Sequence, residues 1–128
     1  MRKTILTIAT LMLGAGAALA DPVEGTWKTQ VDDGAYAHVK IAPCGGAYCG
    51  TMVKTFNAQG AYKSPNRGKQ LLRDMKPAGG GKYEGKVWRP SNDKVYVGKL
   101  ELSGNSLKMK GCVAGGLICS SQTWSRLN

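Results

Sequence analysis

The chain has 128 residues, which is enough for one domain. It carries 18 Lys and Arg against 8 Asp and Glu, a formal net charge of +10, and it has 18 Gly but only one His and one Phe. With so few groups for acid–base chemistry, the composition disfavours most hydrolases and any His-rich metal enzyme. The many glycines instead indicate short strands joined by frequent turns.

The first twenty residues have the layout of a secretory signal peptide. Arg2 and Lys3 form a positive end, residues 5–19 are mostly apolar, and Ala18-Leu19-Ala20 is a small-residue cleavage site. The apolar run is shorter than the roughly 20 residues that a membrane-spanning helix needs, and no later segment is apolar enough to span a bilayer. We therefore expect cleavage after Ala20 and a mature domain at 21–128, in the periplasm or secreted.

The four cysteines of the chain, Cys44, Cys49, Cys112 and Cys119, indicate disulfides in an exported protein. We predict local pairing, Cys44 with Cys49 and Cys112 with Cys119, because each pair flanks a glycine-rich turn. A crossed pairing of Cys49 with Cys112 would gain about 4 kcal/mol, against about 2 kcal/mol for each local bridge, so energy alone leaves the pairing open. The C-x₄-C and C-x₆-C spacings disfavour a zinc site, whose ligands usually come as C-x₂-C, and we expect no metal.

Short alternating runs recur along the mature chain, whereas no window shows a sustained helical period. In residues 35–42, for example, Ala37, Val39 and Ile41 share one face and His38 lies on the other. We therefore predict an all-β domain with little or no helix. Its eight strands are expected at residues 25–30, 35–42, 48–55, 69–75, 82–89, 94–102, 105–112 and 118–127.

The predicted connections are short, and three of them have hairpin-type turn residues: 32–34, 91–93 and 103–105. The longest irregular stretch is 57–68. Because sequential hairpins pair neighbouring strands, the simplest topology is an antiparallel up-and-down meander. Eight such strands can close into a barrel, which removes the exposed sheet edges and is wide enough to be filled by side chains or to hold one small ligand.

The two ends of the mature chain carry a further signal. Gly25 and Trp27 open the first predicted strand, and Trp124 and Arg126 lie near the end of the last. In a closed meander these strands are adjacent, so the guanidinium group of Arg126 can stack on the ring of Trp27. We expect these four residues to close one end of the barrel.

A glycine and a tryptophan on the first strand with a basic residue on the last is similar to the pattern of lipocalin-like (calycin) barrels. The mature chain as a whole more closely resembles a family of small exported bacterial proteins, the domain-of-unknown-function 2147 family. The matching stretches are Asp21-Pro22, Gly25-Thr26-Trp27, Val39-Lys40-Ile41, Cys49-Gly50, Met75 to Gly79, Lys94-Val95-Tyr96, Gly98-Lys99-Leu100, Leu107-Lys108 and Gly111 to Arg126.

This resemblance implies an eight-stranded lipocalin-like barrel. It implies no established activity and supplies no catalytic residues. One segment departs from the family pattern, because many members have a longer, acidic segment where this chain has the short, basic residues 63–68. A contact made by the longer segment in those members does not carry over to this chain.

The barrel interior is the default place for a ligand, since binding sites are concave and mostly apolar with a few polar groups. We predict that it binds a small apolar or amphipathic molecule, with a fully packed core as the alternative. From strand alternation, the candidate ligand-binding residues on the inner face are Val39, Ile41, Tyr83, Val87, Tyr96 and Leu100.

The charge distribution suggests a second kind of partner. Residues 63–99 hold ten basic side chains against three acidic ones, a net charge of +7. Such a surface attracts phosphates, acidic glycans and anionic lipid headgroups, so an anionic envelope surface is a candidate partner. An ordinary solvated face is the alternative, and no motif points to nucleic acid.

Nothing in the sequence indicates catalysis. His38 is the only histidine and is expected to be exposed on the polar face of its strand. Motifs of serine hydrolases and zinc proteases are missing, as is a phosphate-binding glycine loop. We therefore predict no catalytic residue, no cofactor and no enzymatic activity.

Overall fold

The computed structural model describes residues 21–128, which form nine strands and one short 3₁₀ turn. The predicted signal peptide lies outside the described residues. The strands are β1 (Gly25–Lys28), β2 (Tyr36–Cys44), β3 (Ala47–Asn57), β4 (Gly60–Tyr62), β5 (Gln70–Gly79), β6 (Lys82–Arg89), β7 (Lys94–Ser103), β8 (Ser106–Val113) and β9 (Ile118–Arg126), and the 3₁₀ turn is Ala114–Gly116.

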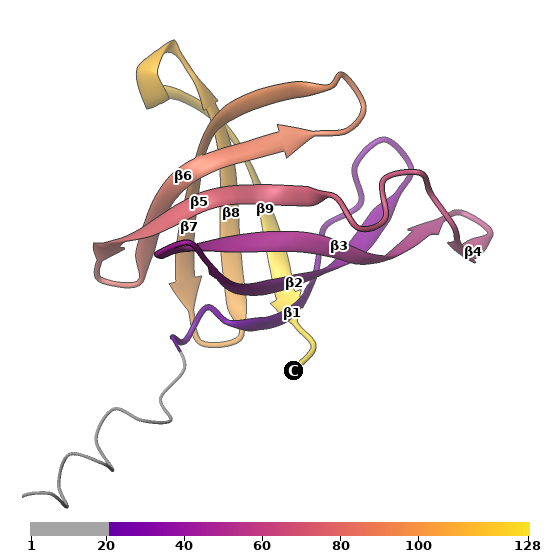
Figure 1. The fold of residues 1–128 in the computed structure, drawn as a ribbon. Coiled ribbons are helices and arrows are strands. Elements are labelled where there is room, and N and C mark those ends of the chain that lie inside the picture. Colours follow the sequence, from indigo (N-terminus) through magenta and orange to yellow (C-terminus); the bar gives the residue numbers. More distant parts are fainter. Residues whose placement is uncertain (1–20) are drawn as a thin grey trace, which may run out of the picture.

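Eight of these strands close into an antiparallel barrel (Figure 1). The sheet order is β2-β1-β9-β8-β7-β6-β5-β3-β4, and an additional β2–β3 pairing joins its two sides. β1 pairs with β9 through Trp27 opposite Arg126, so the first and last strands are neighbours. The predicted fold class, a closed eight-stranded up-and-down barrel, is therefore confirmed.

The structure corrects the prediction that residues 57–68 are irregular throughout. β4 occupies part of this stretch and pairs only with the end of β3, from which it extends beyond the barrel (Figure 1). All three of its residues are exposed. Three exposed residues show no alternation of buried and exposed side chains, which is why the sequence pattern did not reveal the strand.

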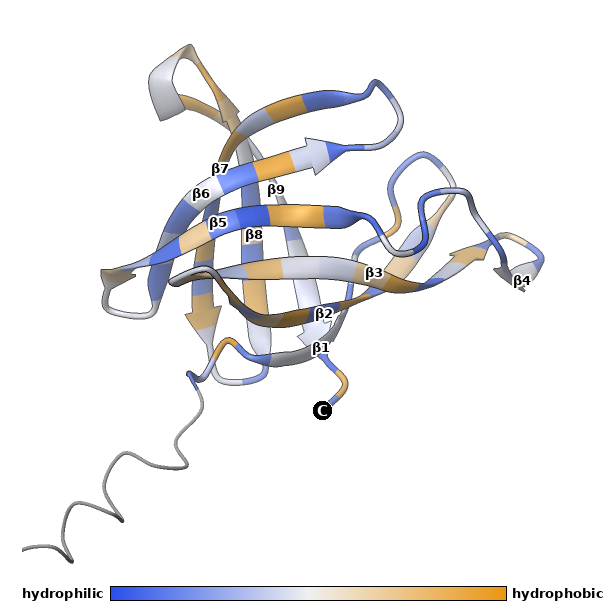
Figure 2. Cartoon of the chain, in the orientation of Figure 1, coloured by the Kyte–Doolittle hydropathy of each residue, from blue (hydrophilic) through white to orange (hydrophobic). Residues whose placement is uncertain are grey.

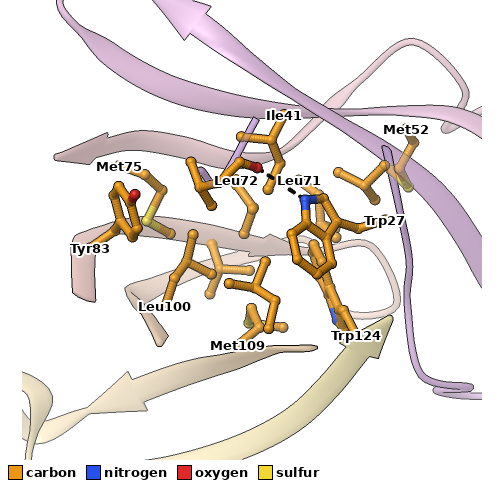
Figure 3. Packing of buried hydrophobic residues seen from close by; sticks show 14 of the residues in the cluster. Trp27, Ile41, Met52, Leu71, Leu72, Met75, Tyr83, Leu100, Met109 and Trp124 are labelled. Atoms are coloured by element: carbon orange, nitrogen blue, oxygen red, sulfur yellow. Dashed lines mark hydrogen bonds between the residues drawn. The ribbon is translucent and has the colours of Figure 1, made fainter. Parts of the chain in front are cut away.

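Hydrophobic and hydrophilic positions alternate along the barrel strands (Figure 2). The buried apolar side chains form one core cluster inside the barrel. The largest fully buried side chains include Trp27, Trp124, Leu72, Met75 and Leu100, which meet in one cluster (Figure 3). They come from four different strands, β1, β5, β7 and β9. The bulk of the core therefore sits where these strands converge, at the end of the barrel that contains the start of β1 and the end of β9.

The N-terminal segment and Arg126 seal this closed end. The indole N–H of Trp27 donates to the carbonyl of Val23 at 3.0 Å, and the Arg126 guanidinium lies 4.3 Å from the centre of the Trp27 ring. The same guanidinium donates to the carbonyls of Glu24 at 3.0 Å and Pro22 at 2.5 Å. The structure thus brings together the barrel-closing residues that the sequence singled out.

The backbone conformation and the surroundings of residue 25 favour glycine. Its φ is +137°, a value that side-chain-bearing residues rarely adopt, and an added Cβ would run into the backbone carbonyl of Asn128. The chain terminus can therefore pass directly over the first strand, where the amide of Leu127 donates to the carbonyl of Thr26 at 2.8 Å.

Two local disulfides lie at opposite ends of the barrel. Cys44 and Cys49 are bonded across the β2–β3 hairpin at the closed end. Cys112 and Cys119 are bonded across the β8–β9 hairpin at the other end. Each bridge ties two strands that are already paired, so the disulfides secure hairpins rather than distant parts of the chain.

Candidate ligand cavity at the open end of the barrel

The end of the barrel opposite Trp27 is open and holds a cavity of about 670 Å³. Its volume lies within the range of roughly 300–1,000 Å³ that is usual for small-molecule sites. The wall is formed by inner-face residues near the open ends of the strands and by the loops that join them. These include Thr29, Val31, Ala35, Ala37, Met52, Thr55, Tyr62, Leu71, Val87, Arg89, Tyr96, Met109, Gly111, Ile118, Ser120 and Gln122.

The cavity exists because small residues occupy the inner face at this end. Ala37 on β2, Gly111 on β8 and Ser120 on β9 all line it, whereas the same strands carry Ile41, Leu107 and Trp124 at the closed end. An added Cβ at Gly111 would lie 3.3 Å from the Val87 side chain, so the glycine leaves room for that side chain inside the barrel. The barrel interior is therefore filled at one end and hollow at the other.

The inner part of the cavity is apolar. Met52, Leu71, Val87 and Met109 form its floor, and all four are buried members of the core cluster. Methionine side chains adapt to ligands of irregular shape because they are flexible and polarisable. This floor suits the apolar part of a small molecule.

Buried polar groups in the wall already have partners. The hydroxyl of Thr29 accepts from the amide of Ala37 at 3.0 Å. The hydroxyl of Thr55 donates to the carbonyl of Tyr62 at 2.6 Å and accepts from the amide of Ser64 at 3.3 Å. Because these groups are satisfied within the protein, they fix the wall in place and do not require a polar ligand.

An ion pair crosses the mouth of the cavity. Arg89 at the end of β6 contacts Asp32 at 3.4 Å and Asp33 at 3.0 Å, both in the turn between β1 and β2. Three strands separate β1 from β6 in either direction around the barrel, so the two partners come from opposite walls. A hydrogen bond with Asp32, followed by the attraction of both carboxylates, raises the pKa of Arg89.

The six predicted ligand-binding residues all lie on the inner face, at two different levels. Val87 and Tyr96 line the cavity. The other four, Val39, Ile41, Tyr83 and Leu100, are buried in the packed half of the barrel and do not line it. Strand alternation identifies the face of a residue but not its height along the barrel axis, which explains the division.

Tyr83 has a structural role at the closed end. Its hydroxyl donates to the carboxylate of Asp21. Burial and then this interaction raise the pKa of Tyr83 well above its usual value. The contact anchors the start of the described chain to β6.

Three residues at the mouth were not among the predicted site residues: Asp32, Asp33 and Arg89. A signal for them exists in the topology. In an up-and-down barrel, alternate turns lie at the same end, so the turns after β1 and β6 must both lie opposite the Trp27 end. Sequence reasoning placed these residues in a turn and in a basic segment but did not combine the two observations.

His38 is partly buried on the outer surface, which corrects the expectation that it is exposed. Tyr36 and Phe56 stack beside it with their ring centres 4.6 Å apart, and the ammonium groups of Lys28 and Lys54 lie over these rings. Partial burial, followed by repulsion from Lys54 and Lys28, lowers the pKa of His38. The only histidine of the chain therefore faces away from the cavity.

Within the part of the chain that the structure describes, no three His, Cys, Asp or Glu side chains come together as a metal site would require. The same residues contain no helix long and apolar enough to cross a membrane.

A family model described as "Uncharacterized protein conserved in bacteria (DUF2147)" matches residues 25–126. The chain belongs to this family. The match runs from Gly25 at the barrel seam to Arg126, so it covers all eight strands of the closed barrel. Among curated protein sequences, none matches the chain significantly.

Two solved structures share the barrel fold. Protein HP1028 from Helicobacter pylori, described as belonging to the lipocalin family, is 19% identical with a TM-score of 0.65, and the match covers 86% of this chain and 85% of that one. Fatty-acid-binding protein 1 from Echinococcus granulosus is 13% identical with a TM-score of 0.50, and the match covers 85% of this chain and 100% of that one. At these identities the likeness establishes the fold alone.

Proposed function

We propose that this member of the DUF2147 family is an exported binding protein that holds a small apolar or amphipathic molecule in the open half of its barrel. The observation that carries the proposal is the cavity of about 670 Å³, with its apolar floor and polar mouth. The lipocalin and fatty-acid-binding folds of the structural neighbours support it. With the single His outside the cavity, we propose binding rather than catalysis.

Binding can be tested by filling the cavity. Ser120 faces the lumen from β9, and because it is exposed a larger side chain there should not disturb the core. We expect Ser120→Trp to weaken binding of the fluorescent apolar probe N-phenyl-1-naphthylamine at least tenfold. Ser125→Trp, at an exposed position of the same strand outside the cavity lining, should bind the probe like the unmodified protein.

Native mass spectrometry of protein isolated from its own compartment supplies an independent test. A co-purified small molecule that is lost from the Ser120→Trp variant would support the proposal. If the unmodified protein neither carries a molecule nor binds the probe, the proposal is wrong.

Export is part of this proposal and rests on the signal-peptide features of residues 1–20. The fold accommodates a chain that begins at Asp21, because the amide nitrogen of Asp21 lies 3.2 Å from the carboxylate of Glu24 and its side chain is held by Tyr83. In a chain cleaved after Ala20, the free ammonium group of Asp21 would pair with the same carboxylate of Glu24. Cell fractionation followed by intact mass measurement should find a chain starting at Asp21 outside the cytoplasm, and a full-length cytoplasmic chain would contradict export.

A second candidate function is contact with an anionic envelope surface, of polymer or lipid. One observation favours it: residues 35–73 contain no Asp or Glu, and their strands carry Lys40 and Lys54 on the outer face. Each lysine near an anionic membrane contributes about 1 kcal/mol. Lys40→Gln with Lys54→Gln should therefore weaken binding to phosphatidylglycerol vesicles by about 30-fold.

The matched control removes two lysines from the other side of the barrel, Lys82→Gln with Lys108→Gln, where both flank Glu101. It should weaken vesicle binding much less. Equal losses in the two double variants would show that only net charge matters, and binding that is absent or insensitive to salt would exclude this function.

A further inference from the structure

The net charge of the cavity lining is opposite in sign to the net charge of the whole chain. Among the described residues that line the cavity, Asp32, Asp33 and Arg89 are the charged ones, which gives the lining a formal charge of −1. The whole chain has a formal charge of +10. A ligand attracted toward the basic surface therefore meets excess negative charge where it would enter.

Arg89 is already engaged by both carboxylates. Its Nη2 lies 3.0 Å from Asp33 and 3.4 Å from Asp32, and its Nε lies 3.4 Å from the second oxygen of Asp32. An anionic head group would have to displace these contacts to reach Arg89. It would then leave two carboxylates unpaired beside its own charge, which opposes its binding.

The other polar residues of the cavity lining are neutral. Tyr62 and Tyr96 present aromatic rings, and Ser120 and Gln122 present a hydroxyl and an amide. Aromatic rings attract cations, and the combination of rings with carboxylates is suited to ammonium groups, including quaternary ones. Hydroxyl and amide groups serve an uncharged polar head equally well.

We propose that the cavity selects amphiphiles with a cationic or uncharged head group and discriminates against anionic ones such as fatty-acid carboxylates. This inference rests on the proposed function, since it specifies the ligand class of the same cavity. It departs from what the overall positive charge of the protein would suggest.

The test uses competitors that share one chain length and differ in head charge. Decyltrimethylammonium, decanol and decanoate, each below its micellar concentration, compete with N-phenyl-1-naphthylamine for the unmodified protein. The cation and the alcohol should displace the probe at concentrations at least tenfold lower than decanoate does. Decanoate competing as well as either of them would overturn the inference while leaving the proposed function intact. A probe that does not bind would instead remove the proposed function, and this inference with it.

A double variant tests whether the carboxylates at the mouth cause the preference for cationic head groups. Asp32→Asn with Asp33→Asn removes two carboxylates and keeps the turn, because asparagine tolerates the φ of +54° at residue 33. In this variant, the concentrations of decyltrimethylammonium and of decanoate that displace the probe should differ by no more than about threefold. Glu84→Gln with Glu101→Gln changes the net charge equally, away from the cavity lining, and should retain the preference. An unchanged preference in the mouth variant, or equal loss in both, would refute the assignment.

A single variant provides a second readout if the double variant does not fold. Arg89→Gln removes the only positive charge of the described lining and leaves both carboxylates. The preference for the cation over decanoate should then rise further, at least threefold above that of the unmodified protein. A decrease would show that Arg89 contributes to ligand binding in the opposite sense to the one proposed.

Discussion

Replacing Arg126 tests how the barrel is held closed. Its guanidinium lies over the ring of Trp27 and donates to two carbonyls of the N-terminal segment, so one side chain connects β9, β1 and residues 22–24. Arg126→Met keeps most of the length and apolar stem of the side chain but removes the charge and all of its donors. The substitution should therefore lower stability without changing the packing of the core.

The size of the effect follows from the contacts that are lost. A cation–π contact at 4.3 Å is worth about 1 kcal/mol at a partly exposed site. A hydrogen bond from a charged donor is worth about 1.5–3 kcal/mol, and the lower value applies because Arg126 is only partly buried and water can replace it. With some further reduction for the more exposed contact to Pro22, the free energy of unfolding should fall by about 3 kcal/mol.

Thermal unfolding followed by circular dichroism measures this effect. For a domain of this size, 1 kcal/mol corresponds to about 4 °C, so Arg126→Met should lower the Tm by about 12 °C. The control is Lys82→Met, at an exposed basic residue without an ion pair in the structure, which should shift the Tm by about 2 °C or less. If Arg126→Met lowers the Tm by no more than its control, the guanidinium does not stabilise the closed end.

Three further predictions concern other parts of the barrel. Replacing Cys112 and Cys119 by alanine opens a loop of sequence separation 7 and should cost about 2 kcal/mol, measured by denaturant unfolding under non-reducing conditions; no loss would mean that the bridge contributes nothing. Because the pKa of folded His38 is below 6.5, the unfolded chain binds a proton first as the pH falls. The stability contributed by neutral His38 is thus complete above about pH 6.5 and is lost below it, so His38→Gln should flatten the stability profile between about pH 7 and pH 5; an unchanged slope would contradict this. Gly85→Ala should destabilise by about 1–3 kcal/mol, since its Cβ would meet the backbone carbonyls of β5, and a neutral effect in thermal unfolding would show that β5 can move away.

Much of the fold could be predicted because its signals are local. Alternation within each run identifies a strand and its buried face, and turn residues mark where each hairpin ends. The eight barrel strands were found in this way, with differences mainly at their ends. β4 was missed because it has only three residues and all of them are exposed, so its sequence shows no alternation of apolar and polar residues.

The cavity could be predicted only in part because its position depends on how the strands are staggered. Leu100 and Tyr96 lie on the same face of β7, yet one is fully buried in the core and the other lines the cavity. Which of the two is buried depends on the side chains at the same height in the barrel, and those side chains come from the seven other strands. The contact of Arg89 with Asp32 spans 57 residues and arises only after the barrel has closed.

If the proposed function is correct, the closed end of the barrel provides stability and the open end binds the ligand. At the closed end, large side chains fill the lumen, and Arg126, Tyr83 and the N-terminal segment cover it. At the open end, small residues leave space and the ion pair of Arg89 is exposed, so it contributes little to stability. Substitutions at the mouth should thus change ligand preference with little change in Tm, while substitutions such as Arg126→Met should lower the Tm and leave the preference unchanged. If the mouth variants instead unfolded the protein, the ion pair would have to be regarded as part of the structural frame, and the charge selectivity of the cavity would need another origin.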